Sequence, residues 1–544
     1  MKRPQNRRIG RYLALGATAL SAPAFAQDRQ VTVQPYVEVN QILTADLQGD
    51  DVVTFTTLSA GVDASIRTRR AEGQVSARYD HLFSWDDDVG DTDVLSGLAR
   101  GSFAVAPGLS IEGGALATRT RTDRPGLGGS PVLLTDDLDA SSQIYSLYAG
   151  PTLSRRIGVA QLDAAYRIGY TKVESPDAFG FVPGGGRRDF FDDATNHLAT
   201  ARLSVAPRAL LPVGLALSGA YEREDAGQLD GRYEGYFVRG DVLAPVSATV
   251  ALAGGVGYER IETSSRDPLL TPAGLPVIDE DGRFATDPAS PLRIDYRTDG
   301  VFYDVGVVWR PNRRTEARAS VGERFGSFSG TGSITYQATD RLSIAVGVYD
   351  GIQTFGRQLR TGLANLPTSF VSARDQFTQQ FSGCVFSGSG QNPGGCLNSV
   401  FQSINTTSYR VRGIDGVVTL TRGPGVIGFG AGYANRDFHT RRVPLGVSIT
   451  GLEDESAYVQ GFYSQPLDAV SGFDAQAFFN WYNQIGVADD ELLSAGAVAS
   501  YYRQFGRLSA TASLGLYSFR VGDFDDSLSA QALIGARYTF GGVR

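Results

Sequence analysis

Apolar and polar side chains alternate from about residue 31 almost to the end of the chain. The last stretch shows this most clearly, because one face would carry Leu528, Ala530, Ala532, Ile534, Ala536, Tyr538 and Phe540. A period of two is typical of a β-strand whose two faces lie in different environments. The stretches exceed the five or six residues common in soluble sheets and suit the roughly 9–11 residues that a tilted strand needs to cross a bilayer. The pattern predicts a transmembrane β-barrel.

Turn-forming residues divide the chain into 22 such stretches. The predicted strands are residues 31–46, 52–68, 71–85, 92–106, 109–121, 141–155, 159–173, 195–206, 211–223, 231–243, 246–262, 299–311, 314–324, 328–338, 341–351, 406–421, 425–437, 454–466, 471–482, 488–503, 506–519 and 526–540. An even number is typical of bacterial single-chain barrels. Counts of 20 to 24 stay open, since merging or splitting neighbouring stretches preserves an even number.

The connections between these strands alternate in length. The even-numbered ones are short, for example Arg69-Arg70, Pro107-Gly108 and Thr339-Asp340. The odd-numbered ones include every long segment, which are residues 122–140, 174–194, 263–298, 352–405 and 438–453. Bacterial barrels have short periplasmic turns and long extracellular loops. The fold class predicted is therefore all-β, a single closed antiparallel transmembrane barrel over residues 27–544 with its long loops at the cell surface.

The start of the chain has the pattern of a secretory signal peptide. A basic region with five Lys or Arg precedes the short apolar run 12–20, and Ala24-Phe25-Ala26 supplies a small-x-small cleavage signal. We predict residues 1–26 as the signal peptide, cleaved between Ala26 and Gln27. Cleavage would leave 45 basic against 58 acidic residues, which changes the formal net charge from −8 to −13. An acidic mature chain argues against a nucleic-acid partner.

Charged residues within the strands indicate which face lines the lumen. An arginine on the lipid face near mid-bilayer costs roughly 2–4 kcal/mol, so these residues should face inward. The predicted lumen-lining residues are Arg67, Arg78, Arg100, Arg167, Arg202, Arg239, Arg310, Arg318, Arg537, Asp63, Asp163, Asp304 and Glu316, with Glu38, Glu72, Asp80, Glu112, Asp241 and Asp474 as further acidic partners. Two hypotheses stay open: the pairs hold the inner wall together, or some of them line a polar permeation path.

The chain contains two cysteines, and both lie in the longest connection, 352–405. In an oxidising compartment, Cys384 and Cys396 are expected to form a disulfide. A 22-stranded barrel would be wider than the 16–18-stranded porins that already enclose an aqueous channel. We therefore expect this loop to fold over or into the barrel mouth and to narrow it. The alternative is a loop that merely covers the surface.

Side chains of the same loop support the constriction hypothesis. Its aromatic residues form an apolar set able to pack, namely Phe370, Phe377, Phe381, Phe386 and Phe401. Its arginines Arg357, Arg360 and Arg374 are expected to meet lumen carboxylates such as Asp304. No globular segment precedes the first strand after the predicted cleavage site, so no N-terminal plug of the kind known in 22-stranded siderophore receptors is expected.

Other chemistry has weak support. The acidic clusters 86–88 and 279–281 can hold a divalent cation, but their spacing matches no EF-hand loop. Solvated loops are the preferred interpretation, and no metal site or cofactor is predicted. Asp437, His439 and Ser448 lie around one loop and are the residue types of a hydrolase. With three histidines in the chain, this coincidence carries little weight, and we expect no enzyme.

The opening strand Gln34-Pro35-Tyr36-Val37-Glu38-Val39 and the terminal Ala536-Arg537-Tyr538-Thr539-Phe540, with the signal peptide, carry a resemblance. The chain resembles Gram-negative outer-membrane β-barrels, and most of all porin-type barrels associated with exopolysaccharide or PEP-CTERM sorting loci. The resemblance implies recognition of the terminal strand by the barrel-assembly machinery, although four residues follow Phe540 here. It also implies contact with outer-membrane lipid and lipopolysaccharide, and periplasmic polysaccharide-export partners.

The function expected from the sequence is a porin-like outer-membrane channel for passive or gated passage of polar solutes. A barrel that supports surface polysaccharide export or attachment is the alternative. A surface hydrolase is the third reading, and it depends on His439 alone.

Overall fold

The computed structural model describes residues 30–49, 51–85, 90–121, 141–174, 191–274, 276–277, 279, 283–387, 393–402, 404–439, 453–485, 491–522 and 527–541. The predicted signal peptide 1–26, the acidic residues 86–88, 280 and 281, and Ser448 lie outside this part of the chain, so what the sequence suggests about them stays a prediction.

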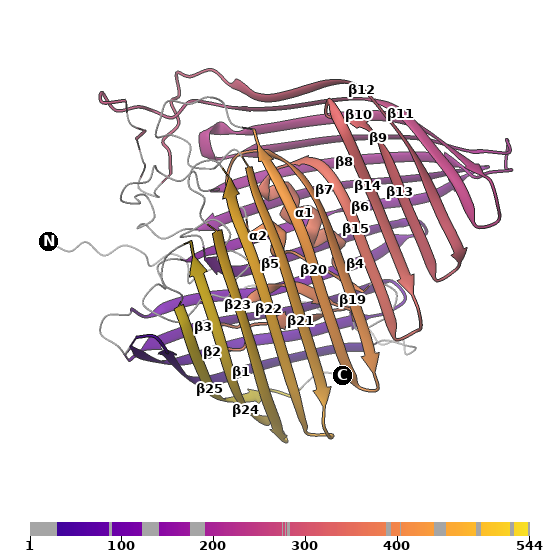
Figure 1. The fold of residues 1–544 in the computed structure, drawn as a ribbon. Coiled ribbons are helices and arrows are strands. Elements are labelled where there is room, and N and C mark those ends of the chain that lie inside the picture. Colours follow the sequence, from indigo (N-terminus) through magenta and orange to yellow (C-terminus); the bar gives the residue numbers. More distant parts are fainter. Residues whose placement is uncertain are drawn as a thin grey trace.

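Twenty-two antiparallel strands form one closed ring (Figure 1). Their bounds are β1 (Gln30–Asp46), β2 (Val52–Arg67), β3 (Ala71–Ser84), β4 (Thr92–Ala106), β5 (Leu109–Arg121), β6 (Ser141–Ile157), β7 (Ala160–Glu174), β8 (Asp193–Val205), β9 (Gly214–Ala226), β10 (Arg232–Pro245), β11 (Val250–Ser265), β12 (Arg293–Asn312), β13 (Thr315–Arg324), β14 (Ser327–Gln337), β15 (Leu342–Gln353), β19 (Tyr409–Arg422), β20 (Gly425–Phe438), β21 (Glu453–Pro466), β22 (Ser471–Ile485), β23 (Glu491–Phe505), β24 (Leu508–Val521) and β25 (Ser527–Thr539).

Pairing of the first strand with the last closes the ring. Tyr36 in β1 lies opposite Thr539 in β25, and Asp46 lies opposite Ser529. The 22 predicted strands and the all-β fold class are confirmed. The largest difference is at β12, which begins at Arg293 rather than at residue 299. Among the described residues, no helix is both long enough and apolar enough to span a membrane.

The alternation of side chains separates the two faces of the sheet, as the period of two requires. On β25, the outward Ile534 is 74% exposed, whereas its inward neighbour Leu533 is 4% exposed. On β24, outward Leu514 and inward Ser513 differ in the same way, with 69% and 3% exposed. The outward face is thus an apolar surface, as a lipid environment demands.

A long insertion between β15 and β19 occupies the inside of the ring. It contains α1 (Phe355–Asn365), β16 (Val371–Arg374), β17 (Phe381–Phe386), β18 (Gly394–Cys396) and α2 (Asn398–Phe401). The three short strands form a separate antiparallel sheet. Figure 1 shows α1 and α2 surrounded by the strands of the ring, and α1 lies against β5 to β8 while α2 lies against β20 and β21. We call residues 354–408 the plug. A short 3₁₀ helix, Gln228–Asp230, joins β9 to β10.

Candidate functional site

The inner wall is apolar where α1 lies. Phe355, Leu359 and Leu363 of α1 are fully buried. They belong to one apolar cluster with inward side chains of β4 to β7, which are Leu98, Leu116, Ile144, Tyr148 and Val173. A wall facing only water would not carry such residues, because leaving each exposed forgoes about 1.5–3 kcal/mol of burial. This inward apolar patch is therefore a signal for the plug, and sequence reasoning missed it.

The start of α1 is tied to β9 by ion pairs. Arg357 and Arg360 both bind the carboxylate of Glu222, with 2.5 Å between Arg360 Nη2 and Glu222 Oε1. The two arginine side chains are 4% and 3% exposed. Burial acts to lower the pKa of Arg357, but the neighbouring Glu222 raises it above its ordinary value, so the guanidinium stays charged. Arg357 also donates to the Ile352 carbonyl at 3.1 Å.

Arg357 and Arg360 thus meet a lumen carboxylate, as expected, but this carboxylate is Glu222 rather than Asp304, which was the example named from the sequence. Asp304 is bound instead by Arg239 of β10, at 2.8 Å. The reason is the course of α1, which runs along β5 to β8 and ends far from β12. Glu222 was not among the predicted lumen residues, although its place on the inward face of β9 follows from the alternation.

Two inward polar side chains satisfy backbone groups of the plug at the end of α1 and just after it. The last carbonyls of a helix lack partners within it, and Arg100 donates to two carbonyls there, those of Ala364 at 2.8 Å and Leu366 at 3.1 Å. A cation at this end also suits the helix dipole. Gln74 both accepts from the Phe370 N–H and donates to the Phe370 carbonyl, each at 2.9 Å. Arg100 thus faces inward and holds the plug.

Further contacts reach the plug from the opposite side of the ring. Tyr517 on β24 donates to Asp375 at 2.7 Å, and Gln460 on β21 accepts from the Cys384 N–H at 3.0 Å. Arg436 on β20 is 0% exposed; it binds Asp454 at 2.7 Å and donates to the Ser399 carbonyl. Because its contacts lie on both sides of the lumen, the plug crosses the ring.

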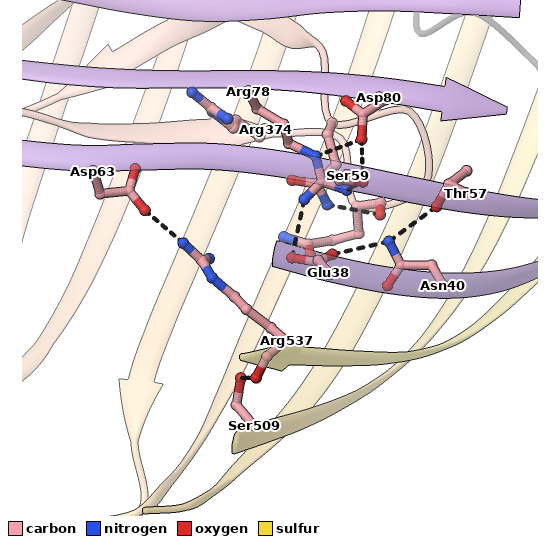
Figure 2. A network of polar contacts seen from close by, with 12 residues as sticks. Glu38, Asn40, Thr57, Ser59, Asp63, Arg78, Asp80, Arg374, Ser509 and Arg537 are labelled. Carbon is pink, nitrogen blue, oxygen red and sulfur yellow. Dashed lines mark hydrogen bonds and ion pairs between the residues drawn. The ribbon is translucent and has the colours of Figure 1, made fainter. Parts of the chain in front are cut away.

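A polar network surrounds the plug residue Arg374 (Figure 2). Arg78 binds Asp80 at 2.6 Å, Glu38 at 3.0 Å and the Ser59 hydroxyl at 2.7 Å. Arg374 itself donates to the hydroxyl and the carbonyl of Ser76, each at 2.9 Å. Burial lowers the pKa of Arg374 below its ordinary value. The network joins β1, β2 and β3 to the plug.

The disulfide joins Cys384 to Cys396 and forms the tip of the plug. Two glycines on the inward face of β20 accommodate this tip. A Cβ on Gly430 would lie 2.5 Å from Cys396 Sγ and 2.7 Å from Cys384 Sγ, and one on Gly428 would lie 2.5 Å from the Phe386 ring. The disulfide tip can therefore lie this close to β20 only because positions 428 and 430 carry no side chain.

We expect Gly430→Val to push the disulfide tip away from β20. Overpacking of this kind typically costs about 1–3 kcal/mol, so the purified barrel should unfold at a lower temperature and trypsin should cut the plug faster. Gly461→Val on β21 is the matched control, because a Cβ there meets no atom within 4 Å. Equal trypsin resistance in both variants would contradict the close fit.

The remaining predicted lumen residues also lie on inward faces, and most of them are paired. The contacts are Arg167–Glu112 at 2.6 Å, Arg239–Asp241 at 2.6 Å, Arg310–Glu316 at 2.9 Å, Arg318–Glu316 at 2.6 Å, Arg537–Asp63 at 2.7 Å, Arg202–Asp241 at 3.9 Å and Ser154–Asp163 at 2.6 Å. Arg67 shares the inward face of β2 with Asp63, four residues earlier. Five of these seven contacts join different strands, either adjacent ones or two strands on either side of a third, and the other two lie within a single strand. The contacts between strands are those expected if the pairs hold the wall together.

Within the described part of the chain, the residues proposed for a hydrolase do not form a catalytic arrangement around His439. The ring of His439 stacks on Tyr296 with 3.8 Å between centroids, and its Nδ1 is buried without a hydrogen-bond partner. A catalytic histidine is oriented by a carboxylate at this atom. Burial lowers the pKa of His439 to about 4. The described residues also contain no group of three or more acidic, histidine or cysteine side chains able to hold a metal ion.

A cavity of about 470 Å³ lies next to the plug in the part of the lumen near the short turns. The plug contributes Val371, Arg374, Gln376 and Gln379 to its lining. The barrel contributes inward residues near the starts of β1, β22 and β24 and near the ends of β2, β21, β23 and β25. We call this cavity the vestibule. The candidate site therefore consists of the plug and the vestibule beside it.

No family model and no curated protein matches the chain. Solved structures similar to it include the FrpB iron transporter from Neisseria meningitidis, with 9% identity, a TM-score of 0.42, and 93% of this chain and 81% of that chain covered. The ferric-catecholate import receptor Fiu from E. coli K12 has 10% identity and a TM-score of 0.43, with 93% and 81% covered. The alcaligin outer-membrane receptor FauA from Bordetella pertussis has 12% identity and a TM-score of 0.39, with 93% and 76% covered.

Similarity at this level carries no argument about what the chain binds. The resemblance to exopolysaccharide-associated barrels also stays a prediction.

Proposed function

We propose that the protein is an outer-membrane channel for polar solutes, and that the plug narrows or gates its lumen. The observation that carries the proposal is the position of residues 354–408. The described residues of this segment fold inside a ring of 22 strands and are held there by inward side chains of β3, β4, β5, β9, β20, β21 and β24.

The two sides of the lumen next to the plug support a channel. Where α1 packs, the wall is apolar and sealed by side chains. The vestibule, in contrast, is an open space lined mainly by polar side chains. A polar space beside a folded plug is the arrangement of a pore whose lumen is narrowed. A barrel with a purely structural role would have its lumen filled by side chains.

Recording of single channels in planar bilayers tests the proposal. Purified protein whose folded state is verified by heat-modifiable migration on gels should give small currents that fluctuate between levels. A complete absence of current from folded protein, over a range of voltages, would refute the channel. The predicted contacts with lipopolysaccharide, the assembly machinery and polysaccharide-export partners are separate proposals that this measurement does not address.

A further inference from the structure

The charged groups of the vestibule nearly cancel. Three carboxylates line it, those of Glu38, Asp63 and Asp474, and two guanidiniums, those of Arg374 and Arg537. Arg537 Nη2 lies 2.7 Å from Asp63 Oδ2 (Figure 2). Glu38 is bound by Arg78 at 3.0 Å. Pores that select ions present rings of side chains of one sign, and the vestibule has no such ring among the described residues.

Most of the vestibule lining is polar but uncharged. Of its 18 residues, ten carry an amide or a hydroxyl, which are Gln34, Gln376, Gln379, Ser464, Ser500, Tyr502, Gln504, Ser509, Thr511 and Thr539. Amides and hydroxyls both donate and accept hydrogen bonds. Three lining residues are apolar, namely Val371, Phe462 and Leu533. Such a surface matches a solute whose own groups are mostly hydroxyls attached to a carbon frame.

The size of the space is also suitable for a small organic solute. Its volume of about 470 Å³ falls within the roughly 300–1,000 Å³ typical of small-molecule sites. A charged solute would have to exchange its hydration shell for a wall on which Glu38, Asp63 and Arg537 are already bound in ion pairs. A neutral solute loses only hydrogen bonds with water that the amides and hydroxyls can replace.

We propose that the vestibule selects neutral polyhydroxylated solutes, of the size of a small oligosaccharide, over ions of equal size. This inference rests on the proposed channel function and specifies its substrate class. The Asp63–Arg537 pair keeps the vestibule close to neutral, because the negative charge of Asp63 and the positive charge of Arg537 lie side by side and neutralise each other.

Three trimers of similar size test the selectivity: raffinose, which is neutral, trigalacturonate, which is anionic, and fully deacetylated chitotriose, which is cationic. Their rates of entry into proteoliposomes should differ by about tenfold in favour of raffinose, the factor that corresponds to 1.4 kcal/mol. Faster entry of either charged trimer would overturn the inference while leaving the channel intact.

Two charge variants sharpen the test. Asp63→Asn leaves Arg537 without its carboxylate and should shift the reversal potential toward anions, whereas Arg537→Gln should shift it toward cations. Arg310→Gln is the matched control, because Arg310 faces the lumen but lies outside the vestibule. In this variant Glu316 is still bound by Arg318, at 2.6 Å, so no lumen carboxylate loses all its partners. Shifts of the same sign in both variants, or an equal shift in the control, would contradict the role of the pair.

The inference and the channel proposal can fail separately. If the folded wild-type protein passes no solute, the channel proposal fails, and calorimetric titration of the same trimers into the protein in detergent still decides the inference. Binding of raffinose alone would support a polyol site. Absence of raffinose binding would overturn it.

Discussion

Replacement of residues 354–408 by the dipeptide Asn-Gly should convert the protein into an open channel whose conductance is several times that of the wild type. Gln353 and Tyr409 are opposite each other in the register of β15 and β19. A two-residue Asn-Gly turn is the favoured connection of such a hairpin, so the ring should still close. Without the plug, the lumen would exceed that of 16–18-stranded porins.

The measurement is single-channel conductance, together with uptake of large antibiotics by cells that carry the variant. The excision should also lower the unfolding temperature, because Leu98, Leu116 and Ile144 lose their contacts with α1. The matched control is the same operation on residues 266–292, since Ser265 and Arg293 are likewise register partners. Wild-type conductance in an assembled plug-free barrel would refute the constriction.

Replacement of Arg357 by Ala should loosen the docking of the plug by about 3–5 kcal/mol, the usual cost of breaking a buried ion pair from one side. Arg357 is 4% exposed and binds Glu222, and its guanidinium lies 3.4 Å from the centroid of the Tyr233 ring. Its loss leaves the buried Glu222 with Arg360 alone. The plug should therefore spend a larger fraction of time away from the wall.

The expected result is a higher open probability in single-channel records and faster tryptic cleavage after Arg374. Arg223→Ala is the matched control, because Arg223 lies on β9 next to Glu222, the partner of Arg357. Arg223 binds Asp225 at 2.7 Å, but both side chains are more than a third exposed, and such pairs contribute about 0–1 kcal/mol. If Arg357→Ala and Arg223→Ala gave the same open probability, the buried pair would not be what holds α1 to β9.

The alternation of side chains along the sequence was sufficient to predict the ring. A period of two depends only on the local strand conformation and on the difference between lipid and lumen, so it placed all 22 strands and the inward face of charged residues such as Arg100 and Arg537. The lengths of the connections likewise indicated which end of the barrel carries the short turns and which carries the long loops. The presence of two cysteines in one connection of a chain expected in an oxidising compartment pointed to the pair Cys384 and Cys396.

Only the tertiary structure decided where the plug lies and what it contacts. The contacts between Arg357 and Glu222, and between Arg100 and the end of α1, join residues more than a hundred positions apart, and no local pattern encodes such a distance. The same holds for Gly430. The sequence gives no reason for a glycine there, and the reason becomes clear only from the disulfide that packs against it in the structure. The vestibule exists because the plug, which packs against the apolar wall of β4 to β7 and crosses to β20, β21 and β24, leaves unfilled the polar part of the lumen near the short turns.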